Sequence, residues 1–136
     1  MKKIVTLMMI SVFFCLPNGS AAEEETADVH VSQHHRHREY AKIKNPVAKT
    51  EASILEGGKL YEKHCMVCHG KAGKGGIGPD LSRRVLKHGS TDGEIFHIIT
   101  SGAKGTAMKG FGDKLPDAMR WHLVNYVSSL KAKEGK

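Results

Sequence analysis

Cys65-Met66-Val67-Cys68-His69 is the stretch that decides how this chain folds. Two cysteines stand three positions apart and a histidine directly follows the second one, which is the c-type haem attachment signature. The two thiols can form thioethers with the vinyl groups on one edge of a haem, and His69 can then offer a ring nitrogen to the iron. The stretch therefore predicts one covalent haem c, attached through Cys65 and Cys68, with His69 as the proximal iron ligand.

The first 22 residues have the pattern of a secretory signal peptide. Two lysines follow Met1, and an apolar run of 13 residues, from 4 to 16, ends shortly before the small residues at 20–22. A run of this length is too short to span a bilayer comfortably, so we favour a cleaved leader over the alternative of an uncleaved membrane anchor. We expect cleavage near Ala22, a periplasmic location, and no stable membrane span in the mature protein.

The chain is moderately basic. Its 136 residues carry a net charge of +7, which falls to about +5 if Lys2 and Lys3 are removed with the leader. This balance favours encounter with acidic surfaces, whereas scattered basic residues with few aromatic neighbours argue against a nucleic-acid partner. We expect a monomer that meets redox-partner proteins whose docking surface is acidic. The lysines that could make this contact, or serve as ordinary surface residues, are Lys71, Lys74, Lys104 and Lys109.

Residues 23–51 predict a flexible linker, because apolar residues are few there and show no sustained period. The linker is rich in histidine, and such a cluster could bind a divalent transition metal. A polar, solvated tether is the preferred interpretation, since no fold fixes the geometry of the ligands. The four histidines concerned are His30, His34, His35 and His37.

Residues 52–136 are expected to form one compact, all-α domain. Ser53 with Glu56, and Thr91 with Glu94, fit capping boxes that would start two helices. A domain this small has little apolar core of its own, so a buried haem would supply the missing part. A third helix is expected from about Pro116 to Leu130, and glycine-rich loops at 70–79 and 102–113 separate the three helices.

From residue 53 to residue 130 the chain resembles class I cytochromes c, the small monohaem electron carriers. Besides the attachment signature, Gly57 and Tyr61 stand where the family has a glycine and an aromatic residue on its first helix. The sequence Gly-Pro-Asp-Leu at 78–81 is similar to the family's Gly-Pro-x-Leu, and residues 121–130 are similar to its last helix. The resemblance implies a cytochrome c-like fold, with three or more short helices wrapped around one covalently bound haem.

The resemblance also implies roles for the residues after the glycine-rich loop. The carbonyl of Pro79 would accept a hydrogen bond from the ring of His69, which orients the ring and raises its basicity. Leu81 would pack on the haem. Arg83 or Arg84 could pair with a haem propionate in fork geometry, and a solvated basic turn is the equal alternative.

The sixth iron ligand is assigned to Met108, which lies where the family places its distal methionine. A thioether favours ferrous iron and raises the reduction potential. The family usually has a proline after this methionine, and Lys109 stands there instead, so we expect a less rigid loop and a more labile ligand. Met119 is the competing methionine, but its helical spacing to Leu123 favours core packing. The alternative histidine ligands are His64, His88, His97 and His122.

Together these features predict a periplasmic electron-transfer protein that carries one electron on haem c with His69–Met108 ligation, and that is not an enzyme. Two alternatives stay open: a fixed haem subunit of a larger complex, or a ligand-binding sensor or peroxidase-like protein with a labile distal methionine. A thioredoxin-like dithiol would need a strand before the cysteine pair, and a zinc site would need two further ligands. The sequence indicates neither.

Overall fold

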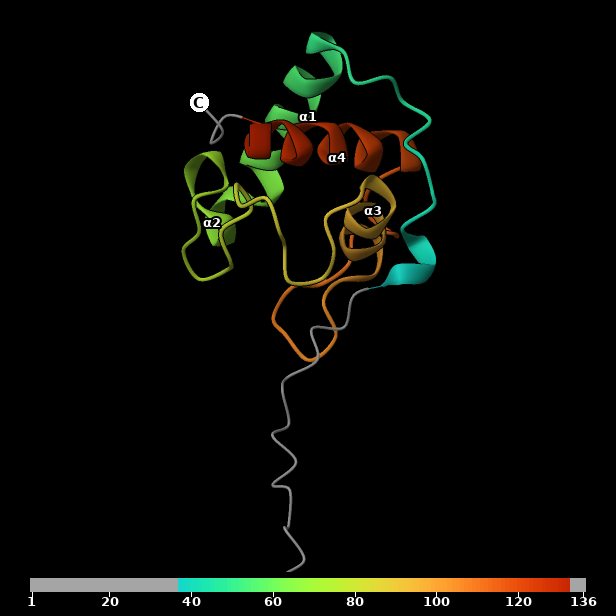
Figure 1. Cartoon of the computed structure of the whole chain (residues 1–136). Coiled ribbons are helices and arrows are strands. Elements are labelled where there is room, and N and C mark those ends of the chain that lie inside the picture. Colours follow the sequence, from blue (N-terminus) through green and yellow to red (C-terminus); the bar gives the residue numbers. More distant parts are fainter. Residues whose placement is uncertain (1–36, 133–136) are drawn as a thin grey trace, which may run out of the picture. The chain divides into compact units, whose positions relative to one another are not determined.

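The computed structural model describes residues 37–132 (Figure 1). The expected leader at 1–22, and the linker as far as residue 36 with His30, His34 and His35, lie outside the described residues. Within 37–132 the chain is helical and forms no strand, which confirms the all-α prediction. The elements are η1 Arg38–Tyr40, α1 Glu51–His64, α2 Met66–His69, η2 Lys71–Gly73, α3 Asp92–Ser101 and α4 Asp117–Ala132.

The first helix begins earlier than its expected cap. Thr50 caps α1, because its side chain accepts a hydrogen bond from the amide of Ser53, 3.2 Å away. The capping box expected at Ser53 is therefore wrong. Ser53 is buried within the helix, and its hydroxyl lies 2.8 Å from Nδ1 of His122 on α4. Because this partner is distant in the sequence, the local pattern of Ser53 and Glu56 could not indicate that Ser53 contacts α4 instead of capping α1.

Helices α1 and α4 cross at close range (Figure 1). Gly57 makes the crossing possible, since a Cβ atom at this position would lie 2.1 Å from the carbonyl oxygen of His122. One turn further along α1, the ring of Tyr61 packs against that of Tyr126, with 5.0 Å between the centroids. The expected contact between the glycine–aromatic face of the first helix and the last helix is thus present.

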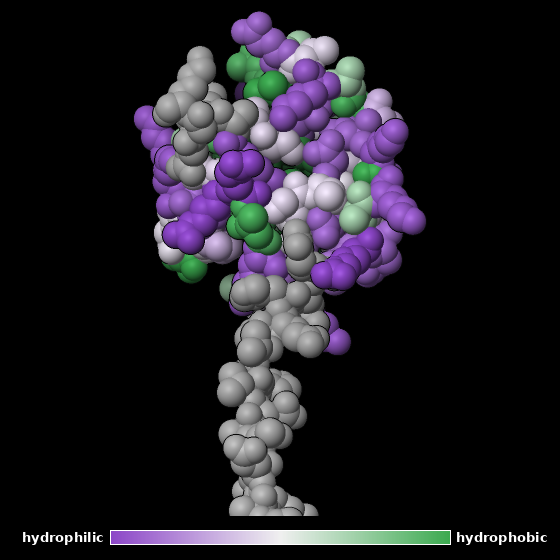
Figure 2. Space-filling model, in the orientation of Figure 1, coloured by the Kyte–Doolittle hydropathy of each residue, from purple (hydrophilic) through white to green (hydrophobic). Residues whose placement is uncertain are grey.

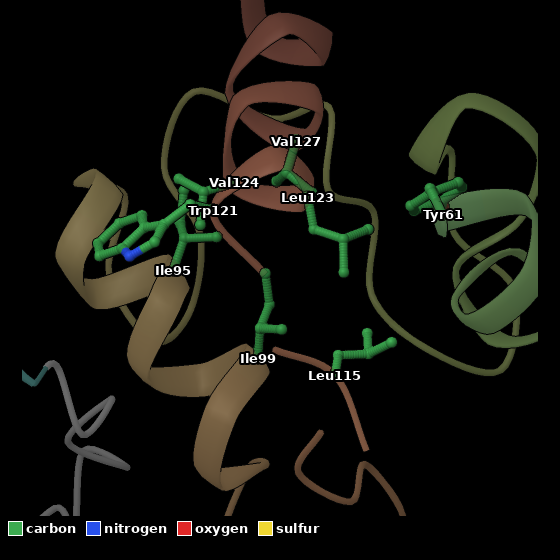
Figure 3. Packing of buried hydrophobic residues seen from close by; sticks show 8 residues of the cluster. All are labelled: Tyr61, Ile95, Ile99, Leu115, Trp121, Leu123, Val124 and Val127. Atoms are coloured by element: carbon green, nitrogen blue, oxygen red, sulfur yellow. The ribbon is translucent and has the colours of Figure 1, made fainter. Parts of the chain in front are cut away.

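Helix α3 packs on α4 and is bounded as the sequence predicted. Thr91 and Glu94 form a capping box at its start, and the amide of Gly102 caps its end by donating to Ile98. Buried apolar side chains of both helices form the core together with Tyr61 of α1 and Leu115, which precedes α4 (Figure 3). The core cluster is Tyr61, Ile95, Ile99, Leu115, Trp121, Leu123, Val124 and Val127.

Two residues depart from their expected environments. Met119, expected in the core, is 40% exposed on the first turn of α4, whereas Leu123 one turn later is 1% exposed. In the stretch assigned to the flexible linker, Asn45 donates to Oδ1 of Asn125 at 2.8 Å. Asn125 in turn donates to the carbonyl of Val47 at 3.1 Å. These hydrogen bonds attach residues 45–48 to α4, so the folded domain begins before residue 52.

No helix among residues 37–132 is long and apolar enough to cross a membrane.

Candidate haem-binding site

A cavity of about 530 Å³ opens between α1, α3, α4 and the segment that follows the glycine-rich loop. Its volume lies within the roughly 300–1,000 Å³ that cofactor pockets have. Figure 3 shows Tyr61 standing apart from Ile99 and Leu123, and all three residues line this cavity. The apolar lining consists mainly of Leu81, Val85, Leu86, Ile95, Ile98, Ile99, Leu123 and Val127.

The short helix α2 presents the attachment motif to this cavity. The amide of His69 donates to the carbonyl of Cys65 at 2.9 Å, which places the two side chains one helical turn apart. Both residues line the cavity, His69 with only 7% exposure, whereas Cys68 is exposed. Burial, with a smaller contribution from Cys68, raises the pKa of the Cys65 thiol to about 11. A reactive dithiol needs a lowered pKa, so this environment does not favour one.

The ring of His69 is oriented by the glycine-rich loop. Nδ1 of His69 lies 2.9 Å from the carbonyl oxygen of Pro79. Because a carbonyl only accepts, Nδ1 carries the proton, and Nε2 is left as the nitrogen that can bind a metal. The loop itself is fastened to α1, since the hydroxyl of Tyr61 donates to the carbonyl of Gly70 at 2.8 Å. Burial raises the pKa of Tyr61 to about 12, so this donor stays protonated further into the alkaline range than an ordinary tyrosine.

The residues after Pro79 form one wall of the cavity. Leu81 and Arg83 line it, while Arg84 is exposed and is not among its lining residues. The Arg83 side chain is largely exposed and lies 3.7 Å from Oδ2 of Asp80. Hydrogen bonds from Ser82 hold the pKa of Asp80 below its ordinary value. Of the two arginines considered for a propionate, the structure thus brings Arg83 to the site.

Lys87 and His88 also line the cavity. Sequence reasoning considered His88 only as an iron ligand and did not consider Lys87. Both precede Gly89, at the turn where the chain leaves the Leu81 segment to start α3. Their position in the sequence could have identified them, because they lie between Leu81, a predicted haem contact, and α3, whose apolar residues line the same cavity.

Met108 is half-buried and lines the same cavity as His69. Met119 is outside the lining. Of the four histidine candidates, all within the described part of the chain, His88 alone lines the cavity. The other three contact the rest of the domain: the ring of His64 packs against Phe111, that of His97 stacks on Tyr40, and His122 meets Ser53.

The other residues considered from the sequence, His37 and the four docking lysines, are not among the lining residues of the cavity. His37 of the histidine-rich segment packs against His97, with 4.4 Å between ring centroids. The four lysines considered for docking are all exposed, and Nζ of Lys74 donates to the hydroxyl of Ser82 at 3.3 Å. Figure 2 shows one face of the molecule, where hydrophilic side chains surround small hydrophobic patches.

The site fits haem c on chemical grounds. A cavity walled by apolar side chains suits the porphyrin, a half-buried thiol stands at its edge, and an imidazole with a defined tautomer is buried beside it. The thioether side chain of Met108 lines the same cavity.

Residues 52–127 match the family model described as cytochrome C oxidase, cbb3-type, subunit III. The chain is 39% identical over 66 residues to cytochrome c-551 of Bacillus subtilis, which covers 48% of this chain and 56% of that protein. It is 33% identical over 87 residues to dihydro-heme d1 dehydrogenase of Pseudomonas aeruginosa, which covers 64% of this chain and 17% of that protein. The chain thus spans about half the length of the first relative and a small part of the second.

Among solved structures, cytochrome cL from Methylophaga aminisulfidivorans superposes with a TM-score of 0.55 at 26% identity, covering 58% of this chain and 53% of that one. The fold of this chain is therefore similar to that of a cytochrome c. The chain belongs to the matched family of cytochrome c domains, and its cofactor is covalently bound haem c.

Proposed function

We propose that this protein carries single electrons in the periplasm on haem c, with His69 and Met108 as the axial iron ligands. The observation that carries the proposal is that Cys65, His69 and Met108 border one apolar cavity. When bound, haem c supplies one-electron chemistry between ferric and ferrous iron.

The residues around the cavity have separate tasks in this proposal. Cys65 and Cys68 hold the cofactor permanently, so that it is not lost between donor and acceptor. Pro79 fixes the proton of His69 on Nδ1, which directs Nε2 to the iron. The apolar walls exclude water, and the soft sulfur of Met108 favours the ferrous state, so both raise the reduction potential.

Two protein ligands leave the iron without an open position for a substrate, which favours an electron carrier over an enzyme. Export is supported by the leader-like pattern of residues 1–22, and outside the cytoplasm the basic surface would meet acidic redox partners. We expect a monomer, with no nucleic-acid partner.

A fixed haem subunit is the second candidate, and one observation favours it. The dehydrogenase relative is far longer than this chain, which covers 17% of it, so a cytochrome domain of this kind occurs as part of a larger protein. Co-purification with a partner at high salt would support a subunit, whereas a clean monomer would support a diffusing carrier.

The test of the ligand assignment uses holoprotein from a host with haem-attachment machinery. The wild-type ferric protein should show the weak far-red charge-transfer band of methionine-ligated haem. Met108→Ala should lose this band and lower the reduction potential by on the order of 0.1 V, a fraction of the range that axial ligands set. Both are measured by spectroscopy during a redox titration.

Met119→Ala is the matched control, because Met119 is an exposed methionine outside the cavity. Its spectrum and potential should equal those of the wild type. An unchanged spectrum in Met108→Ala, or a lost far-red band in Met119→Ala, would overturn the assignment of Met108.

A further inference from the structure

The loop that carries Met108 is tied to the end of α3 by its backbone. Gly102 and Lys109 face each other in an isolated antiparallel bridge, and the amide of Ala103 donates to the carbonyl of Met108 at 3.1 Å. Beyond the bridge, the amide of Phe111 donates to the carbonyl of Ile99 at 2.9 Å. The chain therefore leaves α3, turns and returns along it, with Met108 on the returning side (orange in Figure 1).

Gly102 allows this close return. Its φ of +80° lies in the left-handed region, and a Cβ atom there would stand 2.6 Å from the carbonyl oxygen of Met108. A side chain at this position would push the Met108 backbone away from α3. The backbone path thus depends on a glycine six residues before the methionine.

Thr106 closes the tip of the loop. Its hydroxyl donates to the carbonyl of Ala103 at 2.7 Å and accepts from the amide of Met108 at 3.1 Å. The hydroxyl thus joins Ala103, on the side of the loop that leaves α3, to Met108. The Met108 amide thus has the Thr106 hydroxyl as its partner, and the Met108 carbonyl has the Ala103 amide.

We propose that Thr106 is a positioning residue, which holds Met108 at the iron where the family's proline is absent and thereby sets how readily an outside ligand displaces the methionine. This inference rests on the proposed His69–Met108 ligation. A proline would restrict the backbone after the methionine by its own ring. Here a hydroxyl restricts the backbone before it, so the loop is held although Lys109 replaces the proline.

The apparent affinity of the ferric holoprotein for imidazole, which displaces Met108, measures how firmly Thr106 positions the methionine. Thr106→Val keeps the branched shape and removes both hydrogen bonds of the hydroxyl. We expect its apparent affinity for imidazole to rise about three- to tenfold, as the loss of one or two hydrogen bonds implies. Thr106→Ser retains the hydroxyl and should restore the wild-type affinity. The far-red band of Thr106→Val should also fade at a lower imidazole concentration.

Ser101→Ala is the matched control, since it removes an exposed hydroxyl at the base of the same loop. It should leave the affinity unchanged. Thr106 is itself exposed, so folding of Thr106→Val is expected, and Thr106→Ala removes the same bonds without a branched side chain. Thermal unfolding of each holoprotein separates local loosening from a loss of global stability.

The outcomes separate this inference from the ligand assignment. If Met108→Ala raises the imidazole affinity and Thr106→Val does not, the positioning role is wrong while the ligation stands. If Met108→Ala leaves the affinity unchanged, the ligation itself is wrong. A raised affinity in Thr106→Val that Thr106→Ser does not reverse would also overturn the role, because the hydroxyl would not be the cause.

Discussion

The two loops beside the cavity hold their iron-binding candidates in different ways. On the proximal side, His69 is buried, and its ring is bonded directly to Pro79. On the distal side, Met108 is half-buried, and the hydrogen bonds found there hold its backbone. A thioether is only a weak acceptor, so its position depends on the loop that carries it. The comparison teaches that one candidate ligand, His69, is fixed through its side chain and the other, Met108, through its backbone.

The largest expected effect removes the proximal attachment altogether. Cys65→Ala combined with Cys68→Ala should abolish covalent haem, because neither thioether can form. Mass spectrometry and the spectrum of the haem extracted under denaturing conditions measure the loss. Val67→Ala, an exposed position between the two cysteines, should retain full covalent haem. A normal c-type spectrum in the double variant would contradict the attachment.

A smaller effect is expected from loosening the glycine-rich loop at 70–79, which Tyr61 ties to α1. Tyr61→Phe keeps the packed ring but removes the hydrogen bond to Gly70, which should lower the free energy of unfolding by about 1 kcal/mol. Chemical denaturation of the holoprotein measures it. The imidazole affinity should stay at the wild-type value. A rise as large as that of Thr106→Val would show that the two loops are not independent.

The same tyrosine predicts an alkaline effect. Burial raises the pKa of Tyr61 to about 12 in the folded protein, above the usual value near 10 of an unfolded chain. The unfolded state therefore releases this proton first, and the stability contribution is complete below about pH 10 and is lost as the pH rises toward about 12. Tyr61→Phe should flatten the dependence of stability on pH in this window. An equally steep dependence in the variant would assign the effect to another group.

The smallest effect is expected outside both loops. Deletion of residues 23–36 should leave the haem spectrum and the unfolding free energy unchanged, if the histidine-rich segment supplies no iron ligand. A deletion that continues through residue 48 should keep the spectrum but lower the stability, because it removes the hydrogen bonds of Asn45 and Val47 to Asn125. An altered spectrum in the shorter deletion would indicate a ligand from that segment.

Much of the fold could be predicted because its signals are local. The capping box of Thr91 and Glu94 spans three residues, and the apolar spacing of α4 repeats within single turns. The contacts that could not be predicted join residues that are far apart in the sequence. The partner of Ser53 is 69 positions away, and that of Asn45 is 80 positions away, so no neighbouring residue indicates either bond. Met119 followed the helical spacing of the core, yet it is 40% exposed on the first turn of α4, whereas Leu123 one turn later is buried.

By itself, the sequence determined the cofactor and the helical class of this protein, because thioether attachment and helix capping depend on residues a few positions apart. Only the tertiary structure decided which side chains share the cavity. It brings Met108, Arg83 and His88 to the attachment motif and leaves Met119 and Arg84 outside. It also decided how the distal loop is held, since the bonds of Thr106 and the close approach at Gly102 exist only once the chain has turned back on α3.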